Sequence, residues 1–215
     1  MSKNILYHSL QTYAENISSS ESALLRRLRK ETEGLRGNVM LSSVLQGRTL
    51  ALFSHLLRPK KILEIGTYTG YSALCLAEGL AEGGVLYTIE KSEASVAVAK
   101  RYVKEAGMSK KIHFCIGDAL GLLPQIEGPF DLVFIDADKR GYAQYYDSVM
   151  PSVRSGGLVL ADNVFWDGKV LDLEMREKDA RTKALVDFVE KVKSDKEVGQ
   201  VCLPMRDGIL VVRKH

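Results

Sequence analysis

The stretch KILEIGTYTGYS, residues 61–72, decides the fold of this chain of 215 residues. Its apolar first half ends at Gly66, and Gly70 follows just before a segment with helical character. Glycine allows a tight turn and a close approach of the backbone to a ligand or a neighbouring segment. The stretch therefore predicts a buried strand, a glycine turn and the start of a helix, which together open a βαβ unit.

Downstream of this stretch, short apolar segments alternate with helical ones. Strands are predicted at 61–66, 85–90, 111–117, 130–137 and 157–163, with helices at 71–81, 92–106, 119–126 and 140–153 between them. This alternation indicates right-handed crossovers and a parallel sheet with helices on both faces. A helix at 179–193 then precedes two strand segments that flank Asp207-Gly208, a hairpin signal. We expect an α/β fold with a mostly parallel, seven-stranded sheet that ends in an antiparallel hairpin.

The first sixty residues carry helical patterns and no strand pattern, and Pro59 ends a helix predicted at 42–57. No repeat, low-complexity tract or linker separates them from the rest of the chain. We expect one domain, 1–215, with an N-terminal helical extension at 1–60 and a Rossmann-like core at 61–215.

Composition and charge restrict the class of protein. No apolar run approaches the roughly 20 residues of a membrane span, and the N-terminus has no apolar signal core. Three scattered cysteines favour free thiols in a reducing compartment. These features predict a cytoplasmic protein without a membrane segment. Residues 1–61 hold ten Lys or Arg against four Asp or Glu, which is compatible with contact to RNA or an anionic substrate, although a solvated helix face is favoured.

Polar side chains at the predicted strand ends suit a nucleoside. Ligands of open α/β sheets bind beyond the carboxyl ends of the strands. Glu90 ends the second strand, 24 residues after Gly66, where an acid can accept hydrogen bonds from ribose hydroxyls. Asp118-Ala119 follow the third strand, where they are expected to reach the edge of an adenine base. Tyr68 interrupts the pyrophosphate fingerprint G-x-G-x-x-G, so the loop favours a nucleoside without phosphates over NAD.

A second group of polar residues offers only oxygen ligands. Asp136 closes the fourth predicted strand, and Asp162 with Asn163 closes the fifth. If those strands are neighbours, the three side chains share one sheet edge and suit Mg²⁺, Mn²⁺ or Ca²⁺ better than zinc or copper. The alternative is that the acids cap helices or bind ribose and that Asp-Asn forms a turn. The residues by themselves leave both interpretations open.

Three segments resemble one known family: EIGTYTGYS (64–72), FIDADK (134–139) and ADNVFW (161–166). They are similar to the cation-dependent O-methyltransferases of the caffeoyl-CoA and catechol type, in their bacterial branch. The resemblance extends from about Asn38 to the C-terminus. It implies the Rossmann-like fold of class I S-adenosylmethionine methyltransferases and a homodimer. Tyr142, Tyr145 and Tyr146 are candidates for the dimer surface, or else pack on the sheet.

The resemblance also implies roles for particular residues. A divalent cation (Mg²⁺, Ca²⁺ or Mn²⁺) would be held by Asp136, Asp162 and Asn163, and Lys139 would act with Asp136 in catalysis, as the general base. Trp166 would wall the acceptor pocket. With the loop residue Thr67 and with Asp118 added, the predicted S-adenosylmethionine site comprises Ser42, Glu64, Gly66, Thr67, Ser72, Glu90, Asp118, Ala119, Asp136 and Asp138.

The implied reaction is metal-dependent transfer of a methyl group from S-adenosylmethionine to a hydroxyl of a catechol-like or hydroxycinnamoyl-type small molecule. Two departures from the family pattern weaken the case for caffeoyl-CoA as the substrate. Asp167 stands where plant members carry an Asn that contacts the acyl-CoA, and Lys3 is the nearest counterpart of their substrate-contacting N-terminal Lys. The alternative acceptor is a hydroxylated uridine in tRNA, although no basic patch interleaved with aromatic residues supports it. A further alternative, a non-enzymatic metal and nucleoside-binding module, leaves the combination of Asp136, Lys139, Asp162 and Asn163 unexplained.

Overall fold

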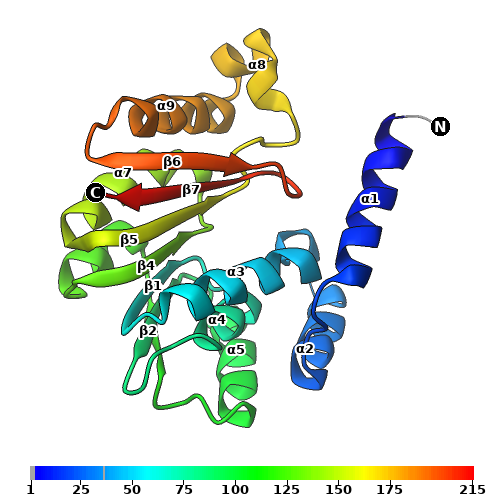
Figure 1. Ribbon diagram of the computed structural model, residues 1–215, viewed down its shortest axis with the longest axis vertical. Helices are drawn as coiled ribbons and strands as arrows, with labels where there is room; N and C mark the ends of the chain where they lie inside the picture. Colours follow the sequence, from blue (N-terminus) through cyan, green and yellow to red (C-terminus); the bar gives the residue numbers. More distant parts are fainter. Residues whose placement is uncertain (1–2, 36) are drawn as a thin grey trace.

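The computed structural model describes residues 3–35 and 37–215, and its centre is a seven-stranded sheet in the order β3-β2-β1-β4-β5-β7-β6 (Figure 1). The strands are β1 (Lys61–Ile65), β2 (Val85–Glu90), β3 (Ile112–Ile116), β4 (Phe130–Ile135), β5 (Val153–Asp162), β6 (Val198–Leu203) and β7 (Ile209–Lys214). Strands β1 to β5 pair in parallel, whereas β7 runs antiparallel to both β5 and β6. The predicted α/β fold with its terminal hairpin is confirmed.

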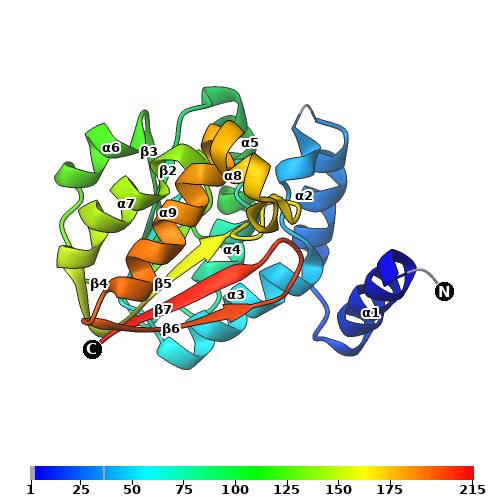
Figure 2. The same ribbon diagram turned by 90° about the horizontal axis from the view of Figure 1, so that it is seen from above.

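Helices cover both faces of the sheet (Figure 2). The α-helices are α1 (Lys3–Ile17), α2 (Ala23–Glu33), α3 (Val44–Leu57), α4 (Tyr71–Ala77), α5 (Glu93–Glu105), α6 (Ala119–Leu122), α7 (Tyr142–Val149), α8 (Leu173–Lys178) and α9 (Ala180–Ser194). Short 3-10 turns are η1 (Asn38–Met40), η2 (Leu123–Gln125), η3 (Lys139–Gly141), η4 (Met150–Ser152) and η5 (Lys169–Leu171). One apolar core joins the sheet to α6, α7 and α9, and a second joins it to α2, α3, α4 and α5. None of the helices in the described ranges has the length and hydropathy of a membrane span.

The three tyrosines of α7 belong to the first core. Tyr142, Tyr145 and Tyr146 are buried against the sheet, and the rings of Tyr142 and Tyr146 meet Phe188 of α9 edge to face. The prediction that they form a subunit surface is therefore wrong, and the alternative, packing on the sheet, is correct.

Some element boundaries differ from the predicted ones. Helix α3 begins at Val44, because Ser43 is its N-cap and accepts a hydrogen bond from the Gln46 N–H. Strand β5 begins four residues before the predicted position, since Val153 pairs with Phe130 of β4. The sequence analysis missed α8, which is capped by the Asp172 carboxylate.

The register of the central strands positions the site. Ile65 of β1 pairs with Ile135 of β4, which pairs with Ala161 of β5. Because parallel strands end at the same edge, the residues that follow or end them meet there. The strand order reverses between β1 and β4, which is the usual place for a ligand in an open α/β sheet. Both views show α1 apart from the sheet, beyond α2 and α3 (Figures 1 and 2).

Candidate active site

A cavity of about 1060 Å³ lies at the carboxyl edge of the parallel strands. Its lining brings together most of the predicted site residues: Ser42, Gly66, Thr67, Ser72, Glu90, Ala119, Asp136, Asp138, Lys139, Asp162 and Asn163. Trp166 lines it too, as expected. Of the remaining predicted residues, Glu64 is fully buried behind the lining, and Asp118 does not line the cavity. One cavity therefore unites residues from the loops after five different strands.

The glycine turn after β1 is closely packed. Gly66 has a φ of 99°, and a Cβ there would lie 1.9 Å from the backbone oxygen of Asp136. The turn presents the Tyr68 N–H, which donates to Glu90 Oε2 at 2.8 Å. The N–H groups of Lys91 and Ser92 donate to Glu90 Oε1. Backbone donors therefore hold the Glu90 carboxylate at the cavity wall, where the nucleoside prediction requires an acid.

Glu64 is a buried carboxylate with one oxygen unused. Thr88 Oγ1 donates to its Oε2 at 2.5 Å, whereas Oε1 has no hydrogen-bond partner in the part of the chain that the structure describes. Burial raises the pKa of Glu64 to about 7. An orphaned acidic oxygen beside a cavity suits a cationic group, because an unmatched buried carboxylate is costly. The ammonium of S-adenosylmethionine fits this requirement.

The Asp118 side chain has other partners. Its carboxylate forms an ion pair with Lys91 at 2.7 Å and accepts from the Gly121 N–H as the N-cap of α6. The hydrogen bond from Lys91 holds the pKa of Asp118 below its usual range. Ala119, which begins α6, lines the cavity in its place. The arrangement favours Ala119 over the Asp118 carboxylate as the neighbour of a bound base.

The predicted metal ligands meet at the tips of β4 and β5. Asp162 is only 4% exposed, and burial followed by the nearby charge of Asp136 raises its pKa. Asn163 adopts a φ of 58°, a conformation that Asn tolerates better than most residues. Among residues 3–35 and 37–215, no group of three or more His, Cys, Asp or Glu could hold a metal. A cation here therefore depends on the Asn163 amide as third donor, and two neighbouring carboxylates with an amide oxygen are a donor set that fits a hard cation.

Two residues that the sequence analysis missed support this group. Gln46 of α3 is buried, and its Nε2 donates to Asp162 Oδ2 at 2.6 Å. Arg206 Nη1 donates to Gln46 Oε1 at 3.2 Å and to the Leu41 carbonyl at 2.9 Å. No local signal distinguished Gln46, because its helix also carries the polar residues Arg48, Thr49, Ser54 and His55. The contact itself spans 116 positions of the chain.

Lys139 is an ammonium group held between two oxygens. It is 7% exposed, with Nζ 2.9 Å from Asp136 Oδ1 and 2.7 Å from the Tyr142 hydroxyl, which in turn lies 3.0 Å from the Asp162 carbonyl. Burial disfavours the charged form of Lys139, but the interactions with Tyr142 and Asp136 outweigh this effect, and the pKa of Lys139 is raised. A role as general base therefore requires further positive charge in the cavity.

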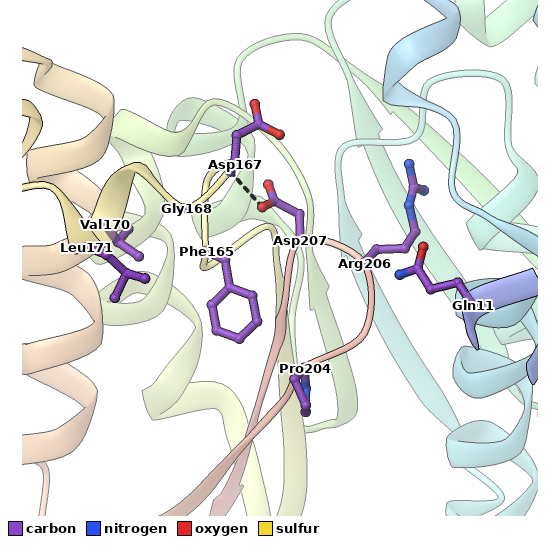
Figure 3. Close-up of a pocket in the computed structure, with 9 residues that line it drawn as sticks. All are labelled: Gln11, Phe165, Asp167, Gly168, Val170, Leu171, Pro204, Arg206 and Asp207. Carbon is purple, nitrogen blue, oxygen red and sulfur yellow. Dashed lines mark hydrogen bonds between the residues drawn. The ribbon is translucent and has the colours of Figure 1, made fainter. Parts of the chain in front are cut away.

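A second cavity, of about 590 Å³, adjoins the first (Figure 3). The two share Asp167, Arg206 and Asp207, and the Asp167 N–H donates to Asp207 Oδ1 at 2.7 Å. Trp166 and Asp167 have φ values of 50° and 53°, an uncommon conformation that clusters at functional sites. The side chain of Lys3, the counterpart considered for the plant lysine, lies outside what the structure describes.

Comparisons with known proteins identify the family of the chain. The model of the O-methyltransferase family matches residues 15–215. The catechol O-methyltransferase of Niastella koreensis is 42% identical over 131 residues, 59% of each protein. The caffeoyl-CoA O-methyltransferase of Stellaria longipes is 32% identical over 203 residues, 90% of this chain and 84% of that one. The O-methyltransferase TomG of Streptomyces achromogenes, solved in complex with S-adenosylmethionine, superposes with a TM-score of 0.91 at 28% identity, covering 100% of this chain and 99% of TomG. The chain therefore belongs to the family of S-adenosylmethionine-dependent O-methyltransferases.

Proposed function

We propose that this protein methylates one hydroxyl of a catechol-like, vicinal dihydroxy small molecule, with the help of a divalent cation held by Asp136, Asp162 and Asn163. One observation carries the proposal. The cavity that is lined by the glycine turn after β1 is also lined by Lys139 and by the side chains assigned to the cation, which are Asp136, Asp162 and Asn163. The bacterial relative named as a catechol O-methyltransferase supports this class of acceptor.

The residues divide the work between the two halves of the cavity. The orphaned Oε1 of Glu64 is assigned to the ammonium of S-adenosylmethionine, and Glu90 to its ribose hydroxyls. Close packing of Gly66 against the Asp136 backbone places the glycine turn, assigned to the donor, beside the residues assigned to the cation. The rest of the donor site is proposed to be Ser42, Thr67, Ser72, Ala119 and Asp138.

The chemistry follows from what the bound groups add. When bound, S-adenosylmethionine supplies a methyl group to the acceptor oxygen and leaves as S-adenosylhomocysteine, while the cation supplies charge that favours the ionised hydroxyl. Lys139 lies at the cavity wall beside Asp136 and is the group assigned to receive the hydroxyl proton. Its own proton must leave first, which the added positive charge promotes. Fixed alignment in the cavity supplies much of the remaining rate acceleration.

Metal dependence is tested by methyl transfer to catechol with Mg²⁺, with EDTA, and with EDTA followed by excess Mg²⁺ or Mn²⁺. We expect EDTA to lower the rate at least 100-fold, which removal of a Lewis acid worth several kcal/mol implies, and the added cation to restore it. Full activity in EDTA would show that the cation assignment is wrong.

The ion pairs of α2 support a small-molecule acceptor over the tRNA alternative. The basic face of α2 is largely occupied by intramolecular partners: Arg27 pairs with Glu105, and Arg29 pairs with Glu21 and Glu33. These contacts favour the interpretation of the basic residues of α2 as a solvated helix face over their interpretation as an RNA-binding surface. Methylation of hypomodified tRNA, with no product from any catechol, would reverse this order.

Gln46 is expected to orient Asp162 toward a bound cation. Replacing Gln46 by Leu removes the 2.6 Å hydrogen bond to Asp162 Oδ2 and should weaken Mn²⁺ binding about 10-fold to 100-fold, as measured by titration calorimetry. Ser54→Ala is the matched control, because Ser54 is buried on the same helix but donates to the Leu76 carbonyl. Equal Mn²⁺ affinity in both variants would contradict this role.

Three further expectations stay predictions: the cytoplasmic location, the single domain with a helical extension at 1–60 and a core at 61–215, and the homodimer. The homodimer is supported by α1, where Leu10, Tyr13 and Ile17 are each more than half exposed. An apolar stripe of this kind on a helix that stands apart suits burial against a second copy.

A further inference from the structure

The second cavity begins where the catalytic cavity ends. Asp167, Arg206 and Asp207 line both, so a molecule placed at the metal ligands can extend past these residues without leaving the protein surface. Figure 3 shows the cavity between the segment that follows β5, the loop between β6 and β7, and Gln11 of α1. Its position suits the part of an acceptor that does not react.

The lining beyond the shared residues is mostly apolar. Phe165, Val170, Leu171 and Pro204 contribute to it. The Phe165 ring packs closely on Gly208 of the hairpin loop, where an added Cβ would lie 2.8 Å from it. Leu171 is 81% exposed, which is a large apolar area for a protein to leave in water. A hydrocarbon group that covers these side chains would be stabilised by the burial of apolar surface.

The charges of the second cavity disfavour an anionic group. Asp167 and Asp207 place two carboxylates at the junction of the cavities. Arg206 at the same junction offsets one of these two charges, and its Nη1 donates to the Leu41 carbonyl and to Gln46 Oε1, so the three side chains keep a net negative charge. An acyl-CoA carries several phosphate charges, which these carboxylates repel.

We propose that the second cavity receives an uncharged, apolar substituent of the acceptor, so that substituted catechols are preferred over acyl-CoA thioesters. This inference rests on the proposed catechol methylation and adds the class of acceptor. The site selects by hydrophobic burial at Phe165, Val170, Leu171 and Pro204 and by repulsion at Asp167 and Asp207.

The first measurement is kcat/KM for catechol, 4-methylcatechol, 4-ethylcatechol and 4-butylcatechol with saturating S-adenosylmethionine and Mg²⁺. Each methylene that enters the cavity is expected to raise kcat/KM about threefold to fourfold, or roughly 30-fold to 60-fold from the methyl to the butyl compound. Methyl caffeate and caffeoyl-CoA, which share one catechol ring, test the charge. We expect the neutral ester to be preferred at least about tenfold, the range of a typical electrostatic mismatch.

Two aspartate variants locate the effect. Leu171→Asp places a carboxylate in the lining and should lower the ratio of kcat/KM for 4-butylcatechol to that for catechol about tenfold or more. Leu173→Asp is the control, because Leu173 is 73% exposed and does not line the cavity, so the ratio should not change. Both side chains are exposed enough for the variants to fold.

The outcomes separate the inference from the proposed function. A flat alkyl series, a preference for caffeoyl-CoA, or equal ratios in the two variants, with catechol still methylated, overturns the inference alone. The absence of methylation of every catechol in Mg²⁺ overturns the proposed function and the inference with it.

Discussion

The Asp162→Asn variant is expected to lose Mn²⁺ binding and about 10³-fold in kcat/KM, while folding at least as stably as the wild type in EDTA. The loss follows because a neutral amide replaces one of two carboxylates available to a cation, and a Lewis acid contributes several kcal/mol to such a reaction. The expected folding stability of the variant follows from the burial of the Asp162 side chain. Asp162 is 4% exposed and near Asp136, so its charge costs folding free energy that Asn removes.

The geometry makes Asn a conservative probe. Its side-chain oxygen can still accept the hydrogen bond from Gln46 Nε2, so the variant changes charge and leaves the packing in place. Calorimetric titration with Mn²⁺ and thermal unfolding in EDTA measure the two effects separately. A variant that keeps Mg²⁺-dependent turnover within tenfold of the wild type would rule out Asp162 as a ligand.

The second large effect is expected from Lys139→Met, which should lower kcat about 10²-fold or more without weakening the binding of Mn²⁺ or S-adenosylhomocysteine. Met keeps the length and apolar stem of Lys but cannot receive a proton. Single-turnover kinetics with saturating acceptor measure the methyl-transfer step, and calorimetry measures the two affinities.

Tyr142→Phe is the control for Lys139→Met. It keeps the buried ring packed against Phe188 but removes the hydroxyl that lies 2.7 Å from Lys139 Nζ. We expect an effect smaller than that of Lys139→Met. A rise in acceptor KM with unchanged kcat in Lys139→Met would make Lys139 a residue that positions the acceptor and takes no proton.

Much of the fold was predictable because its signals are local. The alternation of apolar and helical segments reflects backbone hydrogen bonding within single elements, and it predicted the five parallel strands and the final hairpin. Residues at strand ends share one sheet edge in any parallel sheet, so Gly66, Asp136 and Asp162 could be grouped before their geometry was known. Boundaries were less predictable, since the start of β5 depends on pairing with β4.

The sequence by itself determined the class of fold, the edge of the sheet that carries the candidate site and the oxygen-bearing side chains gathered there. Only the tertiary structure decided how those groups are charged and held. Gln46 reaches Asp162 across 116 positions, Lys139 is paired with Asp136 and Tyr142, and Glu64 keeps an unused oxygen. Burial and partners set the charge state of a side chain, and both arise from contacts between distant segments, which periodicity along the chain does not encode.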